Sequence, residues 1–112
     1  MAAVRVAGLP DAPSAAANAF YQQIGALLAS PSRGENLTLM FEAADHTHTG
    51  WRLAAIQSLA REQAPQRVNA IAGGHAAAVA AALAYLDAAD GVTGQYLPLD
   101  DRGAGFVIQP PA

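Results

Sequence analysis

The chain has 112 residues, of which 53% are hydrophobic and only 13% charged, and its formal net charge is −3. This length predicts a single domain over residues 1–112, and the six basic residues, all arginine and scattered singly, form no basic stripe suited to nucleic acid. The chain contains neither cysteine nor lysine, which excludes disulfides, thiolate metal sites and chemistry that needs an ammonium group.

The N-terminal third predicts one strand and one helix. Val4 to Val6 is a short extended run that Gly8 and Pro10 end. The segment 11–14 then offers side-chain oxygens that can cap a helix, which we expect to run to Ser30. Apolar residues recur in this helix at steps of three and four, which predicts one buried stripe of Ala17, Phe20, Tyr21, Ile24, Leu27 and Leu28.

The middle third predicts a second strand and helix. Leu37 to Ala44 is a nearly continuous apolar run, as expected of a parallel strand covered on both faces. A polar loop at 46–50 follows, and a helix runs from Gly50 to Pro65. The pattern of this helix places Trp51, Ala55 and Leu59 on its buried side and Arg52, Gln57, Arg61 and Glu62 on other sides.

The last third predicts a strand at 67–72, a helix at 76–88 and a strand at 95–99. The helix is apolar nearly all round, with Val79, Leu83 and Leu86 as its core stripe, so we expect it to be buried on more than one side. A short apolar run at 106–108 and a frayed tail at 109–112 follow.

This alternation of strands and helices predicts a small α/β domain. We expect a mainly parallel sheet of about four strands, right-handed crossovers, and helices on both faces in a three-layer arrangement. No apolar run is long enough to span a membrane and no secretory signal is visible, so we expect a cytoplasmic protein.

The final strand, helix and strand carry a more specific pattern. Arg67-Val68-Asn69-Ala70-Ile71 precedes the pair Gly73-Gly74, the alanine-rich helix follows, and the string VTGQYLPLD occupies residues 92–100. This order resembles the last βαβ unit of the short-chain dehydrogenases/reductases, a Rossmann-fold family. The resemblance implies a Rossmann-like fold for the C-terminal two-thirds of the chain.

The same resemblance implies that the catalytic machinery of that family is missing. Residues 50–65 resemble the helix that carries Tyr-x-x-x-Lys, and counting back without gaps puts the tyrosine position at Asp45 and the lysine position at Thr49. Glu42, Ala43 and Ala44 stand where the catalytic serine is expected, and Gly73 replaces a proline near the nicotinamide. No glycine-rich dinucleotide motif is present, so we expect a truncated scaffold with no cofactor.

Polar residues nevertheless follow two strands that should be neighbours, at the edge where open α/β sheets bind ligands. This candidate cleft consists of Glu42, Asp45, His46, His48, Gly73, Gly74 and His75. One interpretation is a metal, acid–base or small-ligand site. The interpretation we favour is structural, with Thr47 or Thr49 capping one helix, His75 capping the next, and the glycines permitting a turn.

The function predicted from these observations is binding or assembly, with a homodimer or another protein as partner. In the family, the last helix and strand often form one subunit interface and two helices from the middle units form the other. The interface candidates are Val79, Leu83, Tyr85, Tyr96 and Phe106. The alternative function is a small enzyme or a ligand- or metal-binding protein that uses the cleft with His46, His48 and His75.

Overall fold

The computed structural model describes residues 1–28 and 35–99. Each helix and strand predicted within these residues is present, and no helix among them is long and apolar enough to cross a bilayer. The elements are β1 (Ala2–Arg5), α1 (Pro13–Leu28), β2 (Leu37–Phe41), the 3-10 turn η1 (His46–His48), α2 (Thr49–Gln63), β3 (Val68–Ala72), α3 (Ala76–Ala88) and β4 (Tyr96–Pro98).

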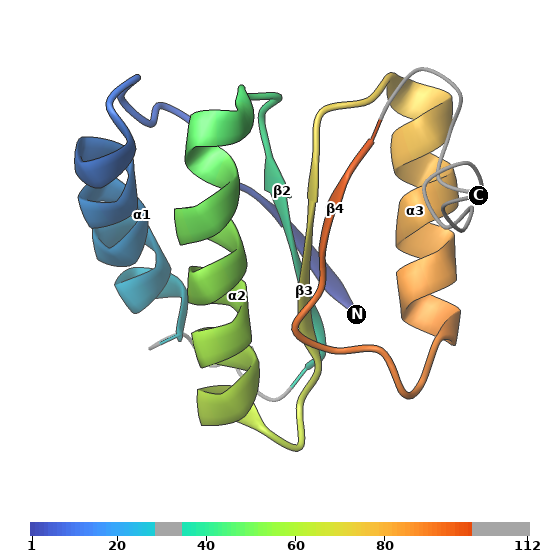
Figure 1. Cartoon of the computed structure of the whole chain (residues 1–112). Coiled ribbons are helices and arrows are strands. Elements are labelled where there is room, and N and C mark those ends of the chain that lie inside the picture. Colours follow the sequence, from blue (N-terminus) through green and yellow to red (C-terminus); the bar gives the residue numbers. More distant parts are fainter. Residues whose placement is uncertain (29–34, 100–112) are drawn as a thin grey trace.

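Four parallel strands form one sheet in the order β1-β2-β3-β4. Helices α1 and α2 cover one face of this sheet and α3 covers the other (Figure 1). All five residues of β3 are buried, because this strand lies between helices on both faces. The predicted three-layer α/β fold with a parallel sheet is therefore confirmed.

The prediction that every crossover is right-handed is wrong for the last one. The strands advance in a single direction across the sheet, so helices on opposite faces require crossovers of opposite hand. The connections through α1 and α2 are right-handed, as almost all such connections are, and the connection through α3 is left-handed (Figure 1). A right-handed path would have left Met40, Ile71 and Leu97 without cover, since these side chains pack on the α3 side.

The strand predicted over residues 37–44 ends earlier, at Phe41, and the segment 42–44 is exposed. The last paired position is Phe41 opposite Ala72, and the small residues Ala43 and Ala44 lie beyond it. The apolar pattern therefore extends beyond the hydrogen-bonded ladder, and Glu42 to Ala44 form the loop at the sheet edge.

The larger part of the core lies between the sheet and the pair α1 and α2. Phe20 and Ile56 are completely buried there, and Phe41 is 4% exposed. On α1 the buried residues are Ala16, Phe20 and Ile24, whereas Tyr21, predicted in the same stripe, is 48% exposed. The stripe is thus narrower than the sequence pattern predicts.

On the opposite face, α3 packs on the sheet through one side only. Ala78, Ala82 and Leu86 are buried and Val79 and Leu83 are half-buried. The rest of the helix surface is exposed in the single chain, so the expected burial on several sides is not achieved within it. Phe106, the run 106–108 and the tail 109–112 lie outside the described residues.

The turn that leads from α3 to β4 is held by side-chain hydrogen bonds between the turn and β3. Asn69 Nδ2 donates to the Val92 carbonyl oxygen over 2.9 Å, and the Gln95 backbone N–H donates to Asn69 Oδ1 over 3.0 Å. Thr93 Oγ1 accepts from the Val68 N–H over 3.0 Å. These bonds place β4 beside β3.

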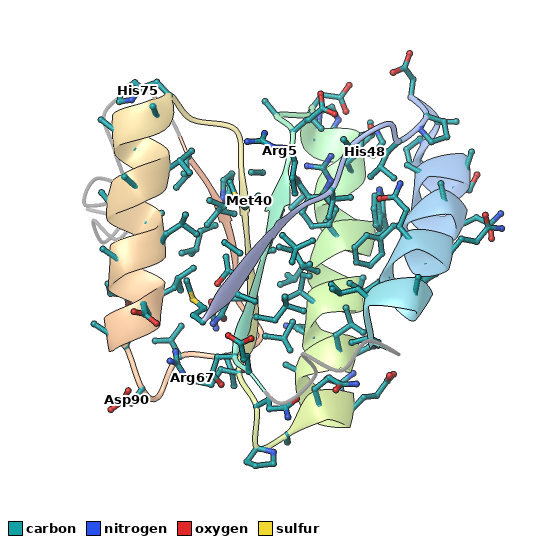
Figure 2. All side chains as sticks on the ribbon, turned by 180° about the vertical axis from the view of Figure 1, so that it is seen from behind. Arg5, Met40, His48, Arg67, His75 and Asp90 are labelled. Carbon is teal, nitrogen blue, oxygen red and sulfur yellow. The ribbon has the colours of Figure 1, made fainter. Side chains whose placement is uncertain are left out.

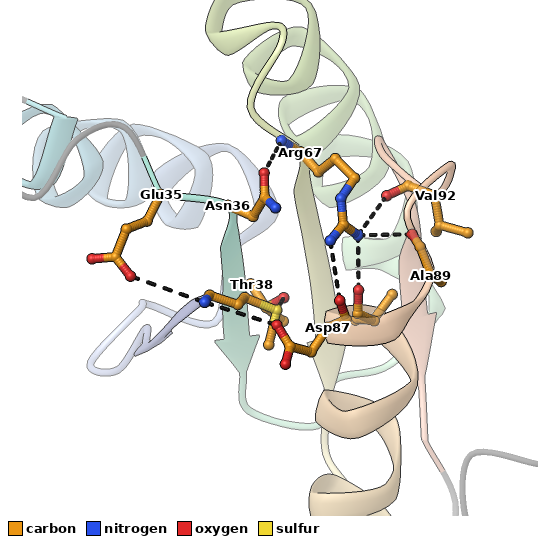
Figure 3. Close-up of polar contacts among 9 residues, drawn as sticks. Glu35, Asn36, Thr38, Arg67, Asp87, Ala89 and Val92 are labelled. Carbon is orange, nitrogen blue, oxygen red and sulfur yellow. Dashed lines mark hydrogen bonds and ion pairs between the residues drawn. The ribbon is translucent and has the colours of Figure 1, made fainter.

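Arg67 closes the C-terminal end of α3 (Figure 3). Its Nη1 donates to the carbonyl oxygens of Leu86 and Ala89, each over 2.8 Å, and its Nη2 donates to the Asp87 carbonyl over 3.3 Å. The last turn of α3 contains no basic residue of its own. Arg67 therefore supplies from the start of β3 the donors and the positive charge that the end of this helix needs.

Candidate functional site

The candidate cleft lies at the carboxyl end of the sheet, but the sheet divides its residues between two faces. Figure 2 shows His75 at the tip of α3 and His48 at the same end of the molecule beside α1, with the strands between them. Among the described residues no three His, Asp or Glu side chains are grouped so that they could hold a metal ion. The three histidines therefore occupy separate environments.

His75 caps α3. Its backbone is extended, and its Nδ1 accepts from the backbone N–H of Ala78 over 3.2 Å. This side-chain acceptor satisfies one of the unpaired donors in the first turn of the helix. The capping role predicted for His75 is confirmed.

His48 is a buried structural residue, only 7% exposed. Its Nδ1 accepts from the indole Nε1–H of Trp51 over 2.9 Å, so this nitrogen carries no proton. Its Nε2 lies 2.9 Å from the carbonyl oxygen of Asp11 and must donate to it. With both ring nitrogens engaged, His48 is a neutral link between α2 and the loop before α1, and it offers no nitrogen to a metal or a substrate.

Asp45 starts the turn η1, and the exposed His46 follows it. The carboxylate of Asp45 accepts from the hydroxyl of Thr47 and from the Thr47 backbone N–H, the latter over 3.0 Å. These bonds, the hydroxyl first, lower the pKa of Asp45 from its ordinary value of 3.8. The cap at this loop is thus Asp45, and neither Thr47 nor Thr49 caps α2 as predicted.

Replacing Thr47 with valine is expected to raise the pKa of Asp45 toward 3.8, because the hydroxyl bond is the largest cause of its depression. Since the folded pKa lies below the unfolded one, the cap is fully formed above about pH 4 and is lost as the pH falls through the folded pKa. Titration of the Asp45 side chain by NMR in the native protein and in Thr47→Val measures the change. Equal pKa values in the two proteins would contradict this origin.

Gly73 and Gly74 are required by the backbone. Their φ angles are +69° and +86°, a region that side chains disfavour. A Cβ on Gly74 would lie 2.9 Å from the Cβ of Leu99, and one on Gly73 would lie 3.1 Å from the Cβ of Ala43. The Gly73 N–H is already bonded to the Phe41 carbonyl over 3.1 Å. The turn explanation predicted for this pair is confirmed.

On the α3 face, these glycines and Glu42 line an open groove of about 630 Å³. Its lining is mainly apolar, with Met40 and Leu83 among the residues, and Arg5 of β1 also lines it. Asp45, His46 and His75 do not line it. The structure thus joins only part of the predicted cleft on this side of the sheet.

The prediction for Arg52 is wrong. This residue was predicted on the polar side of its helix, yet it is 4% exposed. Its Nη1 donates to the Glu42 carbonyl over 2.9 Å and to the Tyr96 hydroxyl over 3.0 Å. The helical spacing does indicate that Arg52 is buried, because Ala55, Ile56 and Leu59 follow it at steps of three, four and seven and are all buried.

Aromatic rings surround the Arg52 guanidinium. Its Cζ lies 4.5 Å from the centroid of Phe41, 5.8 Å from Trp51 and 6.0 Å from Tyr96. Such contacts stabilise a desolvated cation by about 2 kcal/mol or more. Within the chain, Tyr96, a predicted interface residue, packs on the α1 and α2 side and its hydroxyl accepts from Arg52.

Comparison with known families identifies the family of this chain. A family model described as short chain dehydrogenase-like protein matches residues 4–99. The chain belongs to the short chain dehydrogenase-like family. Neither the curated proteins nor the solved structures give a significant match.

In this short chain dehydrogenase-like chain, the resemblance assigns the tyrosine and lysine positions of the family to Asp45 and Thr49. Asp45 is bonded to Thr47, and Thr49 is the exposed first residue of α2. No lysine exists anywhere in the sequence to replace the missing ammonium group. The helix to which the resemblance assigns this pair is present as α2.

Proposed function

We propose that this short chain dehydrogenase-like domain acts in assembly, as a homodimer, and does not transfer hydride. The lack of an acid–base tyrosine at position 45 and of any lysine supports catalytic silence. The purified chain is expected to oxidise no NADH or NADPH in the presence of aldehydes and ketones. Measurable turnover that follows the protein through purification would overturn this part of the proposal.

The outer surface of α3 is the observation that carries the assembly role. The exposed residues on this helix include one charged side chain, Asp87, and Tyr85 is 41% exposed. The others are the alanines at positions 76, 77, 80, 81, 84 and 88. Small side chains allow two helices to approach closely, and an aromatic residue within a weakly charged surface is typical of interfaces.

The neighbouring strand β4 lies at the end of the sheet order, so its outer edge pairs with no other described strand. An open edge of this kind can pair with a second copy. We therefore place the dimer interface on α3 and β4, with Tyr85 at its centre.

The dimer is tested by light scattering at micromolar concentration. Native protein is expected to elute as a dimer, and Tyr85→Asp as a monomer, because the carboxylate would be desolvated in the interface. Tyr21→Asp is the matched control, since Tyr21 is a similarly exposed tyrosine on α1. A monomeric native protein would reject the assembly role, and dissociation by the Tyr21 change alone would place the interface on α1 and α2.

A further inference from the structure

The guanidinium of Arg52 has unused hydrogen-bonding capacity in a buried place. Nη1 donates to the Glu42 carbonyl oxygen and to the Tyr96 hydroxyl. Nε is buried and has no hydrogen-bond partner among residues 1–28 and 35–99. Within these ranges the ion pairs of 4.0 Å or less involve only the amino terminus, so no described carboxylate neutralises Arg52.

A buried cation without an opposite charge is costly, and a buried N–H without an acceptor adds to that cost. The aromatic rings offset part of it, but they accept no hydrogen bond along the edge of the guanidinium formed by Nε and Nη2. This edge carries two parallel N–H donors, which is the arrangement that pairs with both oxygens of a carboxylate.

Arg52 also lines a cavity of about 150 Å³ between the loop before α1, the end of β2 and the start of α2. Its polar lining residues are Asp11, Glu42, His48 and Arg52. The volume equals that of about five water molecules, which suits a very small ligand and excludes a nucleotide. His48 contributes no free donor because both of its nitrogens are engaged.

We propose that this cavity binds a small monocarboxylate, whose oxygens accept from the Nε and Nη2 edge of Arg52. Asp11 and Glu42 are exposed and line the cavity, so their charges repel a dianion such as hydrogen phosphate more strongly than a singly charged ligand. Nε is closed off from solvent in the absence of a ligand, so this pairing requires the guanidinium to turn toward the cavity.

Titration of the native protein with sodium acetate, at an ionic strength held constant with sodium chloride, tests the site. We expect a saturable downfield shift of the Arg52 Nε–H proton by NMR at millimolar concentration. The fluorescence of Trp51, the sole tryptophan and a neighbour of the guanidinium, should change over the same range. Acetamide, which has the shape of acetate without its charge, should produce neither effect.

Two variants complete the test. Arg52→Lys keeps the charge but loses the parallel donors, and acetate should bind it about tenfold more weakly. Glu42→Gln removes a negative charge from the rim without touching the carbonyl that Arg52 uses, and it should tighten binding a few-fold. Should Arg52→Lys fail to fold, the native Nε–H shift and the Glu42 variant still decide.

Three results would overturn the proposal. The first is an acetate response of the native Nε–H that does not saturate or that acetamide reproduces. The second is unchanged acetate affinity in folded Arg52→Lys. The third is tighter binding of phosphate or sulfate than of acetate, which would show that the cavity does not select a carboxylate.

Discussion

Replacing Phe41 with alanine is expected to lower the free energy of unfolding by about 3–5 kcal/mol. Phe41 is 4% exposed and lies at the centre of a ring cluster that joins β2 to three other elements. Its ring centroid is 5.4 Å from Phe20, 5.8 Å from Trp51 and 6.1 Å from Tyr96. Removal of the ring leaves a cavity and also takes away the closest aromatic face of Arg52.

A domain of this size has a total stability of about 5–15 kcal/mol, so Phe41→Ala should be partly unfolded or close to it. Urea denaturation followed by the fluorescence of Trp51 measures the loss. Phe41→Leu is the matched control, because leucine retains apolar contact but provides no ring to the guanidinium, and it should cost about half as much. A loss below about 1 kcal/mol in Phe41→Ala would show that the cluster does not hold the layers together.

The bounds of β3 and α3 were predictable because the local signals there agree with the tertiary environment. The helix predicted over residues 76–88 has those bounds in the structure, since the capping His75 and the preceding glycine pair mark its start. The buried strand β3 reads as an apolar run because both of its faces are covered. For these two elements the local sequence is sufficient to predict the bounds.

Two features depend on the whole fold and were predicted wrongly: the hand of the α3 crossover and the burial of Arg52. The hand of the α3 crossover follows from which sheet face remains to be covered, and this is known only when α1 and α2 are in place. Arg52 was assigned to solvent because charged residues are rarely buried, although its spacing to Ala55 and Ile56 placed it on the apolar side. Its partners come from β2 and β4, which no local window includes.

The sequence predicted where the residues of the candidate cleft lie, but not which of their side chains are free to react. His48, His75 and Glu42 do lie at the carboxyl end of the sheet, as the strand order requires. Whether a histidine is available there depends on its hydrogen bonds, and those of His48 reach Asp11, 37 positions away in the chain. A list of polar residues at strand ends therefore cannot distinguish structural from reactive groups.

Replacing Arg67 with methionine is expected to lower the free energy of unfolding by about 2–4 kcal/mol. Its guanidinium donates to several carbonyl oxygens at the end of α3, two of them at 2.8 Å, and each bond to a charged group contributes about 1.5–3 kcal/mol when it is well formed. Because these carbonyls are partly exposed, water can replace some of the lost hydrogen bonds and so reduce the cost. The loss of a cation at a helix C-terminus adds about 0.3–1 kcal/mol to the cost.

Comparison with Arg67→Lys separates charge from geometry. Lysine keeps the favourable charge at the helix end but cannot reach carbonyls on both sides with a planar fork, so it should recover less than half of the loss. Arg61→Met is the surface control, because Arg61 is exposed and its one described bond is a 3.4 Å contact to Ser58, and it should change stability by no more than about 0.5 kcal/mol. Urea denaturation gives the three values, and hydrogen exchange should show the Arg67→Met loss first in α3 and the turn to β4.

If Arg61→Met lowers the free energy of unfolding as much as Arg67→Met does, general surface charge and not the helix end accounts for the effect. The position of α3 would then depend on its packing on Ile71 and Met40.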